Sequence, residues 1–310
     1  MDYILLLSGF VLLVMGGHWL LKAAVGLSLR LLIPRIIIGM TVVSFATSAP
    51  ELIVSLNSAL EGHADIALGN VIGSNIANIG LVLGIVTIFS TIGVEKSFYK
   101  TDWPVMMISS VMLYVFVVSD GILERYEGII LLVSLVVFLL YLLKFQKRAV
   151  VVDEVVTQKE MTIPVILFFL VLGGVGLWGG SELLIKGAVN LANQFGVGER
   201  VIGVTIISIG TSVPELAASI IAIIKKEKAI SLGNLIGSNI FNILAVLGIT
   251  SIITPIKVQD SHLLTNDIVW MMLFAIIVLP LVFAPVKMKL SWKEGLILLG
   301  IYITFLALTV

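Results

Sequence analysis

Apolar stretches of about 20 residues recur along the whole chain and are separated by short polar segments. A stretch of this length can cross a bilayer as a helix, and inside lipid only helices and closed barrels satisfy every backbone polar group. Ten such stretches are centred near residues 14, 46, 80, 111, 134, 172, 211, 241, 275 and 301. The sequence therefore predicts an all-α integral membrane protein with ten transmembrane helices.

The composition fits a chain whose main solvent is lipid. Of the 310 residues, 59% are hydrophobic and 12% are charged, whereas a soluble domain has roughly 25% charged residues. The chain has no Cys, which excludes disulfides and thiolate metal sites, and its three His residues are scattered. The formal net charge of zero gives no reason to expect nucleic acid as a partner. The lipid bilayer is the partner that this composition predicts, and no protein partner is implied.

The distribution of Lys and Arg predicts the orientation of the chain, because cytoplasmic loops are enriched in both. With the N-terminus outside, 15 of the 19 Lys and Arg residues fall on the inner side, and the other four are Arg125, Lys186, Arg200 and Lys257. The first apolar stretch follows no basic segment and has no cleavage site, so we interpret it as a helix and not as a signal peptide. We expect no targeting extension, and we expect a multi-pass protein of a bacterial or archaeal plasma (inner) membrane with both termini outside.

An internal repeat with an offset of 164 residues organises the chain. When residues 39–84 are aligned with residues 203–248 without gaps, 23 of the 46 pairs are identical, and the identities include Thr, Ser, Pro, Glu and Asn. Five predicted spans separate equivalent positions, so the second copy must cross the membrane in the opposite direction. The acidic loop at residues 61–65 has a basic counterpart at residues 225–228, as expected of loops on opposite faces.

The inverted repeat predicts two halves of five helices each, residues 1–145 and 162–310. They are joined by a short cytoplasmic linker at residues 146–161, which is too short for a regulatory domain. Inverted repeats are typical of secondary transporters, whose sites lie near the bilayer midplane where broken helices of both repeats meet.

The first motif reads TSAPE at residues 47–51 and TSVPE at residues 211–215, within a predicted span of each copy. Pro inside a helix removes a backbone donor and frees carbonyl oxygens one turn earlier. In each copy, the Thr and the Glu are four residues apart and share a helix face. A Glu within the membrane is costly to bury and indicates function. Glu51 and Glu215, beside hydroxyls and freed carbonyls, form an all-oxygen environment suited to hard cations.

The second motif reads GNVIGSNIAN at residues 69–78 and GNLIGSNIFN at residues 233–242. Its paired glycines are four residues apart and allow helices to approach closely. A Ser and the Asn four residues later share a face and add neutral oxygens. Ca²⁺ takes about six to eight oxygens, two Glu neutralise its charge, and the same ligands can hold Na⁺. Competition for one pair of carboxylates would couple the two fluxes. The other Asn of the motif, Asn70, Asn75, Asn234 and Asn239, are expected to pack or to support the ligands.

Both motifs resemble the α-repeats of the cation/Ca²⁺ antiporter superfamily, in particular the short microbial members of its sodium/calcium exchanger branch. The resemblance covers essentially the whole chain, with the repeats in spans 2–3 and 7–8. It implies exchange of Ca²⁺ for Na⁺ by alternating access, with no enzymatic activity and no bound cofactor. The implied calcium ligands are Glu51, Glu215, Thr47 and Thr211, with Asn78 and Asn242 at the border of the central position. The implied sodium ligands are these six residues together with Ser44, Ser48, Ser74, Ser208, Ser212 and Ser238.

The chain departs from the family pattern at position 46, which is Ala where the family often has Gly. Two other features bear on the counter-ion. Position 242 is Asn where potassium-dependent relatives have Asp, which argues against K⁺ co-transport and leaves two acidic ligands. The proton-coupled branch usually has Glu in its second motif, where this chain has Ser-Asn-Ile. These positions favour Na⁺, and an exchanger of Ca²⁺ for H⁺ that uses the same two Glu residues is the alternative.

Two other classes are less consistent with the sequence. A cation channel usually builds its pore from several subunits, whereas this chain contains both halves of its predicted site and is expected to function as a monomer. An enzyme within the membrane is not indicated, because the sequence shows no metal-binding His motif, nucleophile–base pair or phosphate-binding loop.

Overall fold

The computed structural model describes residues 2–145, 161–195 and 208–309. These residues form two compact units, and each is described here by itself. Unit 1 takes its described residues from Met1–Thr47 and Leu140–Asn234, and unit 2 takes them from Ser48–Leu139 and Leu235–Thr309. Each unit thus contains segments of both sequence repeats. The predicted halves, residues 1–145 and 162–310, stay a prediction, and residues 146–160 of the predicted linker lie outside the described part of the chain.

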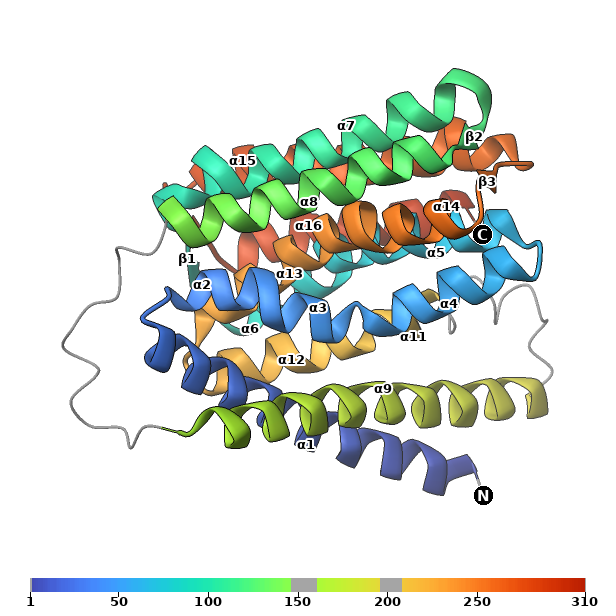
Figure 1. Ribbon diagram of the computed structural model, residues 1–310. Helices are drawn as coiled ribbons and strands as arrows, with labels where there is room; N and C mark the ends of the chain where they lie inside the picture. The colour runs from blue at the N-terminus through green and yellow to red at the C-terminus, as the bar shows by residue number, and fades with distance from the viewer. Residues whose placement is uncertain (1, 146–160, 196–207, 310) are drawn as a thin grey trace. The chain divides into compact units, whose positions relative to one another are not determined.

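The described residues are almost entirely helical (Figure 1); η denotes a π-helix. The elements before the linker are α1 (Asp2–Leu31), α2 (Arg35–Ile38), η1 (Gly39–Val43), α3 (Ser44–Thr47), α4 (Ala49–Leu60), α5 (Ala64–Ala77), η2 (Asn78–Leu83), α6 (Gly84–Phe89), β1 (Ile92–Gly93), η3 (Phe98–Asp102), α7 (Trp103–Asp120), β2 (Ile122–Leu123) and α8 (Arg125–Phe145). Those after it are α9 (Ile163–Gln194), α11 (Ser208–Thr211), α12 (Val213–Ile224), α13 (Lys228–Phe241), η6 (Asn242–Leu247), α14 (Gly248–Ile253), β3 (Ile256–Lys257), η7 (Leu263–Asp267), α15 (Ile268–Phe283), β4 (Lys289–Leu290) and α16 (Trp292–Thr309).

The 164-residue offset of the sequence reappears in the bounds of these elements. α4 and α12, α5 and α13, η2 and η6, and α6 and α14 begin and end at equivalent residues. Helix ends depend on local signals such as capping residues and Pro. The same signals in both copies therefore produce the same series of elements.

The spans agree with the predicted number as far as the chain is described. Eight helices or helix runs of the described residues are long and apolar enough to cross a membrane, and the run Arg35–Thr47 with Ala49–Leu60 forms a ninth that is bent by 43°. The remaining predicted span, centred near residue 211, corresponds to α11 and α12. The residues just before α11, Arg200 among them, lie outside the described part of the chain.

Both copies of the first motif break a helix at the Ser two residues before the Pro. Ser48 has φ −87° and ψ 1°, and Ser212 has φ −90° and ψ 2°. These angles belong to the bridge region, which is sparsely populated and common in active sites. Pro50 and Pro214 lie in the first turn of the next helix, where a missing N–H removes no intrahelical bond. The Pro therefore begins a new helix in each copy, whereas the sequence suggested a Pro inside one continuous helix.

In unit 1, α1 and α9 pack side by side along their length (Figure 1). Glycines make this contact close. A Cβ added to Gly16 would lie 2.6 Å from the Leu177 backbone N, and one added to Gly173 would lie 2.5 Å from the Leu20 backbone N. The two backbones are therefore in direct contact, which only small residues allow.

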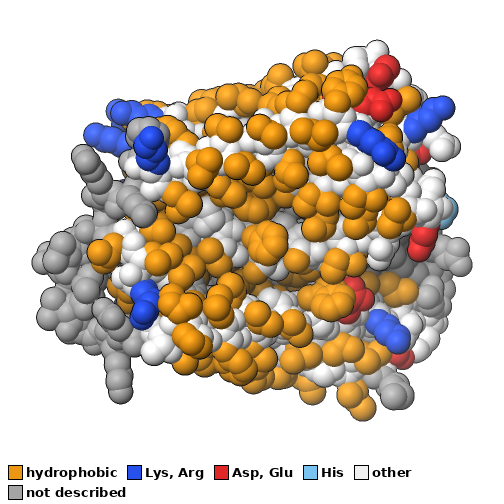
Figure 2. All heavy atoms as spheres, in the orientation of Figure 1, with side chains coloured by type: hydrophobic (Ala, Val, Ile, Leu, Met, Phe, Trp, Pro, Cys, Tyr) orange, Lys and Arg blue, Asp and Glu red, His pale blue; other side chains and the backbone are white. Residues whose placement is uncertain are grey.

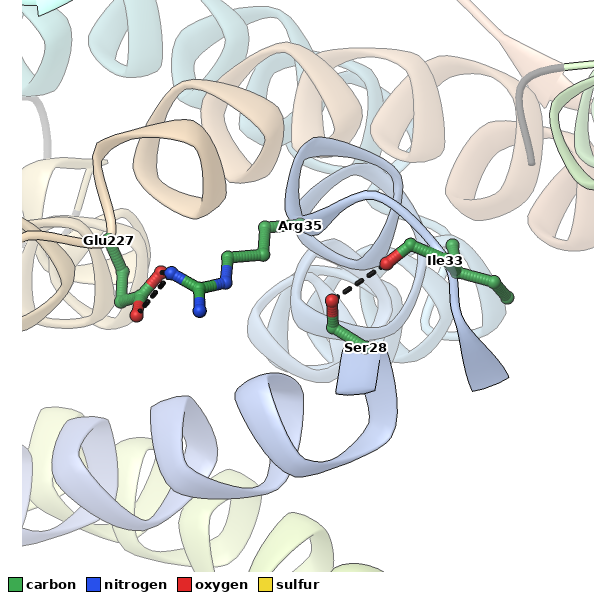
Figure 3. Close-up of polar contacts among 4 residues, drawn as sticks. All are labelled: Ser28, Ile33, Arg35 and Glu227. Atoms are coloured by element: carbon green, nitrogen blue, oxygen red, sulfur yellow. Dashed lines mark hydrogen bonds and ion pairs between the residues drawn. The ribbon is translucent and has the colours of Figure 1, made fainter. Parts of the chain in front are cut away.

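An ion pair in unit 1 ties α2 to the connection between α12 and α13 (Figure 3). Arg35 Nη1 donates to both carboxylate oxygens of Glu227, at 2.8 and 2.6 Å. Nearby, Ser28 Oγ donates to the carbonyl of Ile33 at 2.7 Å and closes the turn between α1 and α2. These contacts fix α2, where the first broken span begins, against the α12–α13 connection of the second repeat.

Unit 2 contains two short antiparallel ribbons, β1 with β4 and β2 with β3. α7 packs on α15, where Trp103 Nε1 donates to the carbonyl of Ala275 at 2.7 Å. α16 packs on α6, and a Cβ added to Gly295 would lie 2.6 Å from the Gly84 carbonyl oxygen. Helices of the two repeats are therefore interleaved within this unit.

Large apolar side chains cover much of the exposed helix surface. Figure 2 shows hydrophobic side chains over most of the visible face, with the few charged side chains mainly near helix ends. Exposed examples are Phe10, Val137, Phe168 and Ile303. Continuous apolar surface of this kind suits contact with lipid and not with water.

Candidate functional site

The two carboxylates of the first motif lie directly after the helix breaks. Glu51 is in the first turn of α4, and Glu215 is in the first turn of α12. Both side chains have an exposure of 0%. Each break therefore holds a buried acidic oxygen pair that can bind a cation.

In unit 1, hydroxyl groups lie on the element that contacts the helix of Glu215. That helix, α12, contacts α3, which carries Ser44 and Thr47. Ser44 Oγ donates to the Asn234 carbonyl at 2.9 Å, and Thr47 Oγ1 donates to Asn234 Oδ1 at 3.2 Å. A hydroxyl that donates its proton in this way still has lone pairs for a cation. Asn234 thus orients two hydroxyls of the first repeat from the second repeat.

In unit 2, the helix that carries Glu51, α4, packs on η6, the π-helix that begins at Asn242. Asn70 Nδ2 donates to Ser55 Oγ at 3.0 Å and to the Glu51 carbonyl at 3.4 Å. Ser55 Oγ donates in turn to the carbonyl of Ala67 at 3.2 Å. These bonds hold α4 on α5 and use the backbone of Glu51, not its carboxylate.

Four Asn side chains of unit 2 form one hydrogen-bonded network. Asn75 Nδ2 donates to the Asn239 carbonyl at 3.2 Å, and Asn239 Nδ2 donates to the Asn75 carbonyl at 3.3 Å. Asn78 Nδ2 donates to Asn239 Oδ1 at 3.2 Å, and Asn242 Nδ2 donates to Asn75 Oδ1 at 3.1 Å. All four side chains are buried. The network joins the second motif of one repeat to the second motif of the other.

Three buried oxygens of predicted ligands have no hydrogen-bond partner among residues 2–145, 161–195 and 208–309. They are Asn78 Oδ1, Asn242 Oδ1 and Ser212 Oγ. Buried polar atoms are nearly always paired, so an acceptor without a partner in the protein requires an explanation. Amide and hydroxyl oxygens are ligands of hard cations, so a cation bound within either unit would satisfy the oxygens of that unit.

The structure buries every predicted site residue whose side chain is described. Those of unit 1 are Ser44, Thr47, Thr211, Ser212 and Glu215, and those of unit 2 are Ser48, Glu51, Ser74, Asn78, Ser238 and Asn242. Of Ser208, only the backbone at the start of α11 is described. The sequence did not predict the partners of Asn75, Asn234 and Asn239. Their one signal is their occurrence in both copies of the second motif.

Comparisons with known proteins identify the family. The family described as sodium/calcium exchanger protein matches residues 1–144 and 165–310. CaxA of Alkalimonas amylolytica is 39% identical over 309 residues, which are 97% of this chain and 96% of CaxA. The inner membrane protein YrbG of Escherichia coli (strain K12) is 36% identical over 320 residues, which cover 98% of this chain and 95% of YrbG.

A solved structure has the same fold. The sodium-calcium exchanger NCX_Mj, soaked with 2.5 mM Na⁺ and 0.1 mM Ca²⁺, superposes with a TM-score of 0.82 and 27% sequence identity, covering 99% of this chain and 97% of that chain. The predicted fold class, an all-α membrane protein of ten helices in two inverted five-helix repeats, is confirmed by this likeness. The protein is a multi-pass membrane transporter and not an enzyme. The chain therefore belongs to the sodium/calcium exchanger family of the cation/Ca²⁺ antiporter superfamily.

Proposed function

We propose that this transporter is a secondary antiporter that exchanges Ca²⁺ for Na⁺ by alternating access. The observation that carries the proposal is the pair of fully buried carboxylates, Glu51 and Glu215, each at a helix break of one repeat. Burial of a carboxylate within the membrane is costly and is tolerated where function needs it. Two carboxylates neutralise the charge of one Ca²⁺.

The proposed ligands are side-chain oxygens of the two motifs and of the residues just before the first motif. For Ca²⁺ they are Glu51, Glu215, Thr47 and Thr211, with Asn78 and Asn242. For Na⁺ they are these six residues together with Ser44, Ser48, Ser74, Ser208, Ser212 and Ser238. Ca²⁺ takes about six to eight oxygens, and Na⁺ ions can share the same carboxylates with neutral oxygens. Because both ions need one pair of carboxylates, binding of one opposes binding of the other, and this competition couples the fluxes.

Relatives support the counter-ion and the location. NCX_Mj is a sodium-calcium exchanger, and its likeness extends over 99% of this chain. YrbG is an inner membrane protein, so we place this chain in the plasma (inner) membrane as well. The Lys and Arg distribution supports an orientation with both termini outside. Because one chain contains both repeats, we propose that it works as a monomer.

The test is uptake of ⁴⁵Ca²⁺ into proteoliposomes loaded with Na⁺, K⁺ or choline at matched pH. Internal Na⁺ is expected to drive uptake, and internal K⁺ or choline is not. Glu51→Gln and Glu215→Gln keep the size of each side chain and remove its charge, so both are expected to abolish uptake because the remaining ligands cannot neutralise Ca²⁺.

Glu294→Gln is the matched control. Glu294 is a buried carboxylate of unit 2 whose Oε2 accepts from the backbone N and from Oγ of Ser291 at 2.6 Å, which caps α16. This variant is expected to keep most of the uptake. Uptake that needs a proton gradient and ignores Na⁺ would move the protein to Ca²⁺/H⁺ exchange. Ca²⁺ uptake that persists in both Glu51→Gln and Glu215→Gln would contradict the proposed site.

A further inference from the structure

The orientation of the Asn network follows from two backbone carbonyls. A carbonyl oxygen only accepts hydrogen bonds, so the side-chain atom of Asn75 that faces the Asn239 carbonyl must be its Nδ2 donor. The amide oxygen of Asn75 is then the atom that faces Asn242. The same reasoning fixes Asn239, whose Nδ2 faces the Asn75 carbonyl and whose Oδ1 faces Asn78.

This constraint passes on to the two predicted ligands. An oxygen of Asn75 faces Asn242, so Asn242 must present its Nδ2 there, and the two atoms lie 3.1 Å apart. Asn78 must likewise present its Nδ2 to Asn239, at 3.2 Å. The amide oxygens of Asn78 and Asn242 are therefore the atoms that remain, and both are buried without a hydrogen-bond partner among the described residues.

Asn75 and Asn239 have little capacity left to bind an ion themselves. In each, Nδ2 donates to a backbone carbonyl and Oδ1 accepts from a neighbouring amide. Each Nδ2 also lies near a Met sulfur, at 3.7 Å from Met271 for Asn75 and 3.8 Å from Met106 for Asn239. Their side chains are 2% and 3% exposed. Both side chains use their hydrogen bonds on other protein groups, so they can affect a bound ion only through those groups.

We infer that Asn75 and Asn239 are positioning residues that fix the amide oxygens of Asn242 and Asn78 for ion binding, each acting across to the opposite repeat. The inference rests on the proposed function, because it concerns ligands of the proposed site. Without these two residues, the amides of Asn78 and Asn242 can rotate and present Nδ2, a donor that repels a cation, in place of Oδ1. Half-saturation by Ca²⁺ then needs a higher concentration.

The bonds are crossed, and the crossing provides the test. Asn75 bonds to Asn242 and not to Asn78 on its own helix, and Asn239 bonds to Asn78 and not to Asn242. The experiment uses Asn→Ala at each of the four positions and the four double variants that pair a positioning residue with a ligand. The readouts are half-saturating Ca²⁺ and maximal rate of Na⁺-driven uptake in proteoliposomes. A second readout, which does not require turnover, is the rise in unfolding temperature of the purified full chain on addition of Ca²⁺.

Asn75→Ala and Asn239→Ala are each expected to raise half-saturating Ca²⁺ roughly fivefold to tenfold. Asn75→Ala added to Asn242→Ala is expected to change it less than about twofold further, and so is Asn239→Ala added to Asn78→Ala, because the partner is already absent. In the double variants of one repeat, Asn75→Ala with Asn78→Ala and Asn239→Ala with Asn242→Ala, the increase in half-saturating Ca²⁺ is expected to be the product of the two single increases.

The outcomes separate the two proposals. Wild-type uptake driven by Na⁺, with coupling confined to the crossed pairs, supports the inference. Wild-type uptake with multiplicative effects in all four pairs, or variants that lower only the unfolding temperature without Ca²⁺, overturns the positioning role and leaves the exchanger intact. A wild-type protein that neither takes up Ca²⁺ nor is stabilised by it overturns the proposed function, and this inference with it.

Discussion

Asn70 and Asn234 hold equivalent positions in the two repeats but have different surroundings. Asn70 is half-buried and donates to Ser55 Oγ. Asn234 is 1% exposed, donates to Ser219 Oγ at 3.4 Å, and accepts from Thr47 Oγ1. Both Asn side chains donate to the equivalent Ser of their own repeat, and Asn234 also accepts a bond within unit 1.

Asn234→Ala is therefore expected to destabilise the protein more than Asn70→Ala. The first variant removes two buried bonds and is expected to lower the free energy of unfolding by about 1–3 kcal/mol. The second removes bonds of a half-buried side chain, and about 0.5–1.5 kcal/mol is expected. Thermal unfolding of both variants in the same detergent gives the comparison. A larger loss for Asn70→Ala would contradict the role assigned to Asn234.

The burial of the proposed site residues was largely predictable, but the orientation of their amide groups was not. The repeat and the cost of burying Glu in a membrane pointed to Glu51 and Glu215, and both are fully buried. The direction of the Asn78 and Asn242 amides depends on Asn239 and Asn75, which lie on the opposite repeat. A sequence pattern describes which residues share a helix face, and contacts between helices far apart in the chain lie beyond it.

At the scale of elements, the contact between α1 and α9 depends on particular glycines of one helix. Gly173→Ala is expected to force the two helices apart, because its Cβ would lie 2.5 Å from the Leu20 backbone N. Overpacking against backbone costs about 1–3 kcal/mol. Gly179 lies in the same helix, and a Cβ there meets nothing within 4 Å among the described residues.

Gly179→Ala is the matched control and is expected to be neutral or to stabilise α9 by up to about 1 kcal/mol, since Ala is the better helix former. Thermal unfolding of the two variants side by side measures the difference. Equal effects at both positions would show that helix propensity, and not close approach, determines the result.

The ion pair between α2 and the α12–α13 connection gives a second prediction for an element contact. Glu227→Gln is expected to lower the free energy of unfolding by roughly 1–2 kcal/mol, because this ion pair is partly buried and charge-assisted and so exceeds the usual exposed pair. Lys225→Gln, at an exposed residue of the same connection, is expected to change it by less than about 0.5 kcal/mol. If the Glu227→Gln effect vanishes in low salt, where ion pairs are strongest, the pair does not stabilise unit 1.

Some features of the elements followed from the sequence and others did not. The TSAPE and TSVPE motifs predicted a disturbed helix, and the breaks are at Ser48 and Ser212. The π-helices η2 and η6 were not predicted. A π-turn depends on an extra residue accommodated by packing on neighbouring helices, and periodicity of apolar residues does not reveal it.

At the scale of the molecule, contacts between loops agree with the predicted topology. β1 and β4 come from loops predicted inside, and β2 and β3 come from loops predicted outside. In unit 2, the backbone N of Gln259 donates to Asp65 at 2.8 Å, and both residues are predicted outside. In unit 1, Arg35 and Glu227 are both predicted inside. Counting the spans could predict which loops share a face of the membrane, because each transmembrane helix carries the chain to the opposite face. The division into two compact units could not be predicted, since it depends on contacts between the repeats.

The absence of Cys makes the orientation directly testable. Asp120→Cys is expected to react with a membrane-impermeant maleimide in intact cells, because its loop is predicted outside. Lys96→Cys and Lys287→Cys are expected to react only after the membrane is permeabilised. All three side chains are exposed. The unmodified chain is the control without label, and the reverse labelling pattern would place both termini inside.

The reciprocal bonds between Asn75 and Asn239 also bear on how such a chain arose. Residue i of one repeat contacts residue j of the other, and j contacts i, which is the rule for an isologous interface between two identical subunits. A single-repeat ancestor could thus have paired with a copy of itself inserted in the opposite direction. Gene fusion would then have freed each copy to diverge, and the acidic loop at residues 61–65 with its basic counterpart at residues 225–228 records such a divergence.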